Sequence, residues 1–390
     1  MTDDIRQARM AQALAQRAHD LLISHSFAQQ QIGYIHTFDL NFGEDVPQRT
    51  LLEVEIAASA KRQQQNTSHL KYIAKASSHL HQVIENVINK KREDLDNLYQ
   101  EVVGIQDTVP TILDILAVKS ASVSRLEPLV NDLPWLGRDL VSLVNLPQYR
   151  KQRGTSTAVK VDTPALALRY LGLENLQLVI PTFAMRHWMP HATEPFPLLK
   201  RKLRDLSMST AIAARELAEL QGVHPQQAFT LGMLLDLGKI AATRLYLRTF
   251  EAVWQNKVQI ARDNNKKDLH TALLGLQPDA LYLRNLLMYD SMQLSKQLIE
   301  KMGFRYLPFS AVMEQFALHY LPNSEPLADP LPLTQVLKQA QGYAQYLVLK
   351  ENNLIEPDEV KIWFDYLDIG PDALDKLAKC SYQTLQLTIN

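Results

Sequence analysis

The chain has 390 residues, a formal net charge of −1 and one cysteine, Cys380. The balanced charge gives no overall attraction to nucleic acid or acidic membranes, and a single cysteine excludes an intramolecular disulfide. Hydrophobic residues make up 46% of the chain, enough for a sizeable core. The apolar runs are too short to cross a bilayer, and the acidic N-terminus does not resemble a secretory signal. We therefore expect a cytoplasmic protein without a membrane partner.

Helix is the predicted secondary structure throughout, because glycine is rare and strand-like alternation is almost absent. Helices are expected over residues 1–30 and 48–63, with a loop over 33–47. A longer helix is expected over 68–103, with an apolar face made of Leu80, Ile84, Val87, Leu95, Leu98 and Val102. Residues 1–104 are thus predicted to form an N-terminal helical region. The long helix either packs on its own domain or serves in dimerisation or signalling, and both readings stay open.

From residue 105 onward, capping residues mark further helices. Thr108 and Thr163 can each cap a helix with a proline in its first turn, and Gly172 suits a helix C-terminus. The helix opened by Pro225 is expected to close at Gly238. Later helices are expected over residues 289–302, 312–320, 333–350, 357–366 and 371–387, with a proline-rich connector over 323–332.

Residues 228–239, AFTLGMLLDLGK, resemble the central signature of the HDOD family, roughly A-F-x-x-G-L-L-H-D-I-G-K. Residues 165–172 resemble its "A-I-x-x-L-G" piece, 206–211 stand where the family has "H-S-x-x-x-A", and 317–320 resemble a later "A-I-x-x-H-H" helix. HDOD is a branch of the HD phosphohydrolase superfamily. The resemblance implies an all-α, HD-like multi-helix bundle over residues 105–390, including a C-terminal helical extension.

The resemblance also implies that the ancestral metal site is lost. In a working HD enzyme, an adjacent His and Asp ligate a metal that activates water. Here Leu235 and Leu206 stand at histidine positions, which leaves Asp236 as the remaining ligand type, and one carboxylate would hold a metal only weakly. We expect a degenerate homologue without catalytic residues, metal or cofactor. A vestigial pocket is predicted at Leu206, Leu235, Asp236, Lys239 and His319.

Asp236 is predicted to lie near the C-terminal end of its helix, where the helix dipole disfavours a carboxylate. A compensating partner is therefore expected: Lys239, an arginine or backbone donors. A pair of histidines is not expected to bind a metal. His187 and His191 flank Pro190, which argues against a helical metal site.

Two basic clusters, residues 149–153 and 200–204, lack interleaved aromatic residues. They are predicted to be solvated helix faces and not nucleic-acid sites. Contact with an anionic partner, such as a nucleotide second messenger or an acidic protein patch, is the alternative. Together these observations favour a non-catalytic bacterial protein of signal transduction or regulation that acts through a protein partner. A divergent metal-dependent phosphohydrolase and a nucleotide-sensing domain remain as alternatives, and a homodimer stays open.

Overall fold

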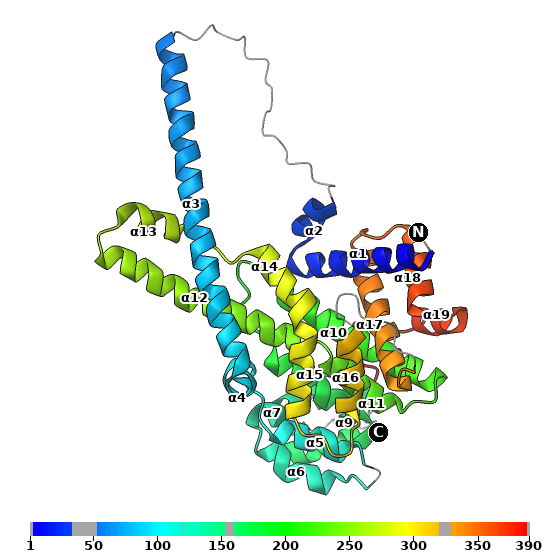
Figure 1. The fold of residues 1–390 in the computed structure, drawn as a ribbon. Coiled ribbons are helices and arrows are strands. Elements are labelled where there is room, and N and C mark those ends of the chain that lie inside the picture. Colours follow the sequence, from blue (N-terminus) through cyan, green and yellow to red (C-terminus); the bar gives the residue numbers. More distant parts are fainter. Residues whose placement is uncertain (1–2, 33–52, 119, 153–159, 320–328, 388–390) are drawn as a thin grey trace.

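The computed structural model describes residues 3–32, 53–118, 120–152, 160–319 and 329–387. Within these ranges, the side chains of residues 3–6, 53–69, 150–152 and 319 lie outside the description. All regular elements of the described residues are helices, as predicted, and no strand occurs among them (Figure 1).

The N-terminal part contains one very long helix. Its elements are α1 (Asp3–Ile23), α2 (His25–Ile32), α3 (Glu53–Glu93), α4 (Leu95–Asn97) and the π-helical turn η1 (Leu98–Val103). Helix α3 runs through both stretches that were predicted as separate helices, but it ends at Glu93 and not at residue 103. The backbone leaves the helical region at Asp94, with φ −91° and ψ 84°, and the Asp94 side chain caps the next turn.

The central part holds the helices around the signature segment. They are α5 (Thr108–Leu116), α6 (Val123–Asn131), α7 (Pro134–Val144), α8 (Pro147–Gln152), α9 (Pro164–Trp188), α10 (Leu199–Leu220), α11 (Pro225–Leu234) and α12 (Leu237–Asp263). Thr163 caps α9 as predicted, and Gly172 kinks that helix at φ 67°. Thr108 is the first residue of α5 and does not cap it, because the N-cap position is Asp107.

The C-terminal part agrees closely with the prediction until its last helix. Its elements are α13 (Lys267–Leu274), α14 (Ala280–Asn285), the turn η2 (Leu286–Asp290), α15 (Ser291–Lys301), α16 (Phe309–His319), α17 (Pro332–Glu351), α18 (Pro357–Leu367) and α19 (Pro371–Ala378). Helix α19 ends well before the predicted residue 387. Most of the expected connector over 323–332 lies outside the described residues.

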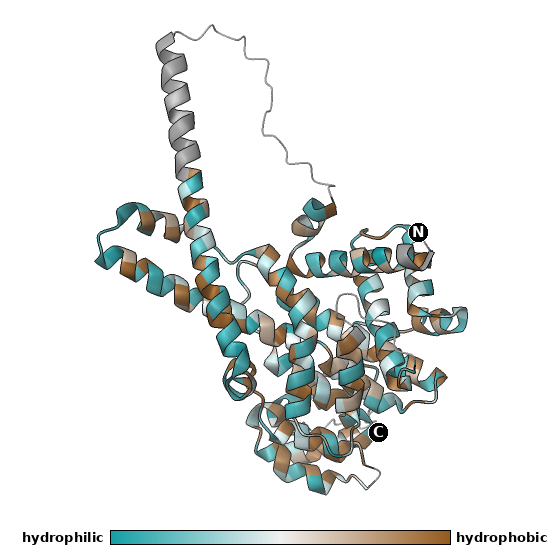
Figure 2. Ribbon diagram, in the orientation of Figure 1, coloured by the Kyte–Doolittle hydropathy of each residue, from teal (hydrophilic) through white to brown (hydrophobic). Residues whose placement is uncertain are grey.

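Helices from both ends of the chain share one core with the centre. Helix α10 packs against α11 and α17, and α1 lies across α17 and α18 (Figure 1). The Arg17 guanidinium on α1 pairs with the Glu359 carboxylate on α18 at 2.8 Å. Figure 2 shows both apolar and polar residues on the helices of this bundle, and α12 and α13 pack beside α3. The buried core extends over Leu80, Ile84 and Ile88 of α3.

Candidate functional site

The signature segment forms two helices and not one. Helix α11 ends at Leu234, α12 begins at Leu237, and Asp236 is the N-cap residue between them. The prediction that one helix closes at Gly238, with Asp236 near its C-terminal end, is therefore wrong. Asp236 instead lies between the C-terminal end of α11 and the N-terminal end of α12, and the α12 dipole stabilises a carboxylate there by about 0.3–1 kcal/mol.

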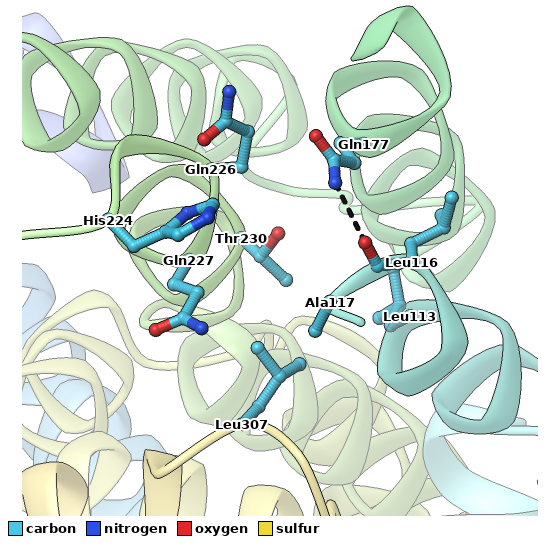
Figure 3. Close-up of a pocket in the computed structure, with 9 residues that line it drawn as sticks. All are labelled: Leu113, Leu116, Ala117, Gln177, His224, Gln226, Gln227, Thr230 and Leu307. Carbon is cyan, nitrogen blue, oxygen red and sulfur yellow. Dashed lines mark hydrogen bonds between the residues drawn. The ribbon is translucent and has the colours of Figure 1, made fainter. Parts of the chain in front are cut away.

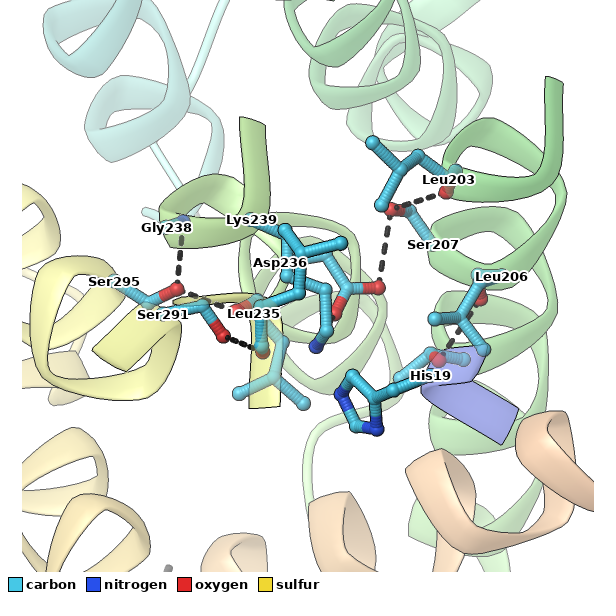
Figure 4. A network of polar contacts seen from close by, with 12 residues as sticks. His19, Leu203, Leu206, Ser207, Leu235, Asp236, Gly238, Lys239, Ser291 and Ser295 are labelled. Atoms are coloured by element: carbon cyan, nitrogen blue, oxygen red, sulfur yellow. Dashed lines mark hydrogen bonds and ion pairs between the residues drawn. The ribbon is translucent and has the colours of Figure 1, made fainter. Parts of the chain in front are cut away.

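Helix α15 holds the break between α11 and α12. The Ser295 hydroxyl donates to the Leu235 carbonyl at 2.6 Å and accepts from the Gly238 N–H at 2.8 Å (Figure 4). A Cβ atom on Gly238 would lie 1.8 Å from the Ser291 carbonyl oxygen. Glycine is therefore required for this approach, and one hydroxyl satisfies backbone groups on both sides of the break.

The Asp236 carboxylate is buried and paired. Its Oδ1 lies 2.5 Å from the Lys239 ammonium, and its Oδ2 accepts a hydrogen bond from the Ser207 hydroxyl at 3.2 Å. The two charged residues are 0% and 1% exposed. Lys239, one of the expected compensating groups, is therefore the partner of Asp236.

The predicted pocket residues come together only in part, and they enclose little space. Leu206 and Leu235 are buried near the Asp236–Lys239 pair (Figure 4). Leu206 lines a cavity of about 10 Å³, which has room for about one water. His319 ends α16, and its side chain lies outside the described part of the structure.

His19 is a member of this cluster that sequence reasoning missed. Helix α1 carries it into the bundle, and Figure 4 shows its imidazole beside Lys239 and Leu206. The ring nitrogen Nδ1 lies 2.7 Å from the Ala15 carbonyl, to which it can donate a proton. Burial, helped by the positive charge of Lys239, lowers the pKa of His19 to about 3. The imidazole is therefore neutral, and nothing in the local sequence distinguishes it from other polar residues of an amphipathic helix.

A second buried charge pair lies next to His19. The Asp20 carboxylate is 3.3 Å from the Arg284 guanidinium, and both side chains are almost fully buried. Burial raises the pKa of Asp20 to about 6, although the charge of Arg284 opposes the shift. Helix α1 thus joins the bundle through polar as well as apolar contacts.

The other predicted candidates are distributed over the molecule. The imidazole of His187 stacks on Trp135 with ring centroids 4.1 Å apart, and burial lowers its pKa. In the part of the chain that the structure describes, no group of three or more His, Cys, Asp or Glu residues is placed to hold a metal. No long apolar helix of membrane-spanning character occurs there either.

The basic cluster 200–204 is not uniformly solvated. Lys202 is buried, its ammonium donates to the Leu21 carbonyl of α1, and burial lowers its pKa to about 8. The prediction of a solvated face is therefore wrong for Lys202, although it holds for Lys200, Arg201 and Arg204. In the cluster 149–153, the side chains beyond Tyr149 lie outside the described residues.

Two hollows lie away from the Asp236 cluster. One is a cavity of about 10 Å³ lined by Gln177, His224, Thr230 and neighbouring residues (Figure 3). The Gln177 side-chain amide there donates to the Leu116 carbonyl at 2.7 Å (Figure 3). The other is a groove of about 450 Å³ beside α12.

Residues 104–281 match the model of the HDOD domain family. This stretch is an HDOD domain. It contains Leu206, Leu235, Asp236 and Lys239, whereas His319 lies beyond the match. Helices α1, α17 and α18 contribute to the same hydrophobic core, but their residues lie outside the matched stretch. No curated protein matched the chain.

Solved structures with some similarity include an HDOD domain protein and a protein named as a phosphohydrolase. An HDOD domain protein of unknown function from Geobacter sulfurreducens is 17% identical, with a TM-score of 0.44, and the match covers 76% of this chain and 94% of that one. A provisionally named phosphohydrolase from Shewanella amazonensis SB2B is 18% identical, with a TM-score of 0.39 and coverages of 73% and 97%. These scores are low, so the family assignment rests on the sequence match of the HDOD domain.

Proposed function

We propose that the protein is a non-catalytic regulatory protein of bacterial signal transduction, working in the cytoplasm by binding a protein partner through its HDOD domain. One observation carries the proposal. Leucine occupies both histidine positions, and the remaining carboxylate, Asp236, already pairs with Lys239 in the core. The relation to the HDOD family fits a role in signalling.

The ion pair competes directly with metal binding. A divalent metal needs several nitrogen or oxygen donors, and to take Asp236 it would have to displace the Lys239 ammonium. That ammonium would then stay buried without its partner, which typically costs about 3–5 kcal/mol. Metal-dependent hydrolysis at this position is therefore energetically disfavoured.

The absence of catalysis is tested on the full chain, incubated with Mn²⁺ or Fe²⁺ and then desalted. We expect no stoichiometric metal by elemental analysis and no chelator-sensitive hydrolysis of bis(p-nitrophenyl) phosphate. About one or two metal ions per chain, removed by EDTA together with hydrolysis, would instead support the divergent phosphohydrolase.

The protein partner requires a separate test. Partners found by cross-linking at native expression levels are purified and mixed with the chain, and the complex mass is measured by light scattering. We expect a complex of defined stoichiometry that EDTA does not alter. If no purified partner binds, while a nucleotide raises the melting temperature, the nucleotide-sensing alternative is preferred.

A further inference from the structure

The groove beside α12 has the size of a ligand site. Its volume of about 450 Å³ lies within the range of about 300–1,000 Å³ that small-molecule pockets occupy. Its walls are α12, the loop that follows α9 and the segment between α13 and α14. None of the predicted vestigial-pocket residues lines it, so it is distinct from the Asp236 cluster.

Two arginines of α12, one turn apart, line this groove. Nη1 of Arg244 donates to the carbonyls of Val103 and Trp188, at 2.8 and 2.9 Å. Nη1 of Arg248 donates to the Glu101 carbonyl at 2.8 Å. Among the described residues, no hydrogen-bond partner contacts the Nε or Nη2 atom of either arginine. Neither guanidinium forms an ion pair with a carboxylate of these residues.

Arg248 is exposed to solvent, whereas the charge of the buried Arg244 is only partly compensated. Arg244 is 9% exposed, and burial together with the neighbouring Arg248 lowers its pKa to about 10, so it stays charged at neutral pH. The carbonyls that it contacts belong to the last residues of η1 and α9, whose dipoles offset part of that charge. An oxyanion between the arginines would reduce the electrostatic repulsion between their charges. It would also accept hydrogen bonds from their free N–H groups.

The rest of the groove is largely apolar. Leu247, Phe250 and Trp254 of α12 face Leu276 and Pro278 across it. The Trp254 indole N–H donates to the Leu273 carbonyl at 2.7 Å, which fixes the ring and leaves its surface for contact.

Two carboxylates, Glu194 and Glu251, also line the groove, but both side chains are exposed and screened by solvent. They disfavour a long polyanion that would run past the two arginines. The lining therefore favours a compact ligand with a single oxyanion group.

We propose that this groove binds a small organic anion, a phosphate monoester or carboxylate attached to an aromatic or aliphatic body. The oxyanion lies on Arg244 and Arg248, and the body lies against Phe250 and Trp254. This ligand site goes beyond the proposed protein-binding role and does not depend on it.

Isothermal titration calorimetry of the full chain at low salt tests the proposal with phenyl phosphate, benzoate and neutral benzyl alcohol. We expect one-to-one binding of at least one of the two anions, which also identifies the preferred oxyanion, and no binding of the alcohol. Arg248→Ala should weaken that binding by about tenfold or more, because a charge-assisted hydrogen bond is lost. The matched control is Arg262→Ala, which removes an exposed arginine of the same helix outside the groove and should leave the affinity unchanged.

Trp254→Leu tests the apolar wall and should weaken phenyl phosphate binding but not that of inorganic phosphate. A circular dichroism melt of each variant establishes that it is folded. The proposal is overturned if neither anion binds up to about 10 mM, far above the range of specific ligands. It is also overturned if Arg248→Ala binds the preferred anion as tightly as the wild type. Where phenyl phosphate is that anion, equally tight binding of inorganic phosphate overturns it too.

Discussion

Replacement of Asp236 by alanine should be among the most destabilising single changes in the HDOD domain. The carboxylate is fully buried, pairs with the Lys239 ammonium at 2.5 Å and accepts from the Ser207 hydroxyl. At an effective dielectric constant of about 20, this separation gives a Coulomb attraction of roughly 7 kcal/mol. Most of that attraction offsets the desolvation of two charges, so the net contribution of the pair is small.

Removing only one partner has a much larger effect. Asp236→Ala leaves the ammonium buried without a counter-charge, and we expect a loss of about 3–5 kcal/mol in the free energy of unfolding. Asp236→Asn should cost nearly as much, because the amide keeps an acceptor for Ser207 but not the charge. Combining Asp236→Ala with Lys239→Met removes both charges and should recover much of the loss.

Urea unfolding at pH 7, followed by circular dichroism, measures these differences. The control is Asp205→Ala on α10, because this carboxylate is half-exposed and pairs with Arg204 at the surface. Its effect should stay within about 1 kcal/mol. Unchanged or raised midpoints for both Asp236 variants would refute the structural role of the pair and revive a ligand-binding role for Asp236.

Three further outcomes are expected. Between pH 7.5 and pH 5, His19→Phe should gain about 2 kcal/mol of stability relative to the wild type. The reason is that unfolded His19 takes up a proton below its ordinary pKa of 6.5, whereas in the fold its pKa is about 3. Parallel pH profiles of the two proteins in urea melts would contradict this reasoning. Gly238→Ala should destabilise by about 1–3 kcal/mol, because its Cβ would lie 1.8 Å from the Ser291 carbonyl oxygen. Gly275→Ala, with its nearest atom at 3.7 Å, is the control, and equal melting temperatures would argue against the close packing of α12 on α15. Finally, fluorescence anisotropy should show no submicromolar, salt-sensitive binding of RNA or DNA. That expectation is overturned by such binding if it disappears when the exposed charged residues of the cluster 200–204 are replaced by alanine.

Much of the fold could be predicted from the sequence because helix signals are local. Apolar spacing and the rarity of glycine indicated an all-α chain, and Thr163 marked the start of α9. Gly172, predicted to follow the end of a helix, instead marks a kink after which α9 continues to Trp188. The signature over residues 228–239 also identified the family, since it depends on residue types in a fixed order. For the same reason, Leu206 and Leu235 could be predicted to stand at histidine positions of the family pattern.

Tertiary contacts decided the features of the site that the sequence did not reveal. The signature segment is apolar and reads as one continuous helix, but the hydroxyl of Ser295 and the close approach at Gly238 hold a break there. That break places Asp236 between the end of one helix and the start of another, so the favourable dipole of α12 opposes the unfavourable dipole of α11. His19 and Lys202 acquire their partners only when α1 packs on the bundle. Local patterns carry no information about which distant segment will cover a residue, and burial is what sets the charge state and pairing of these groups.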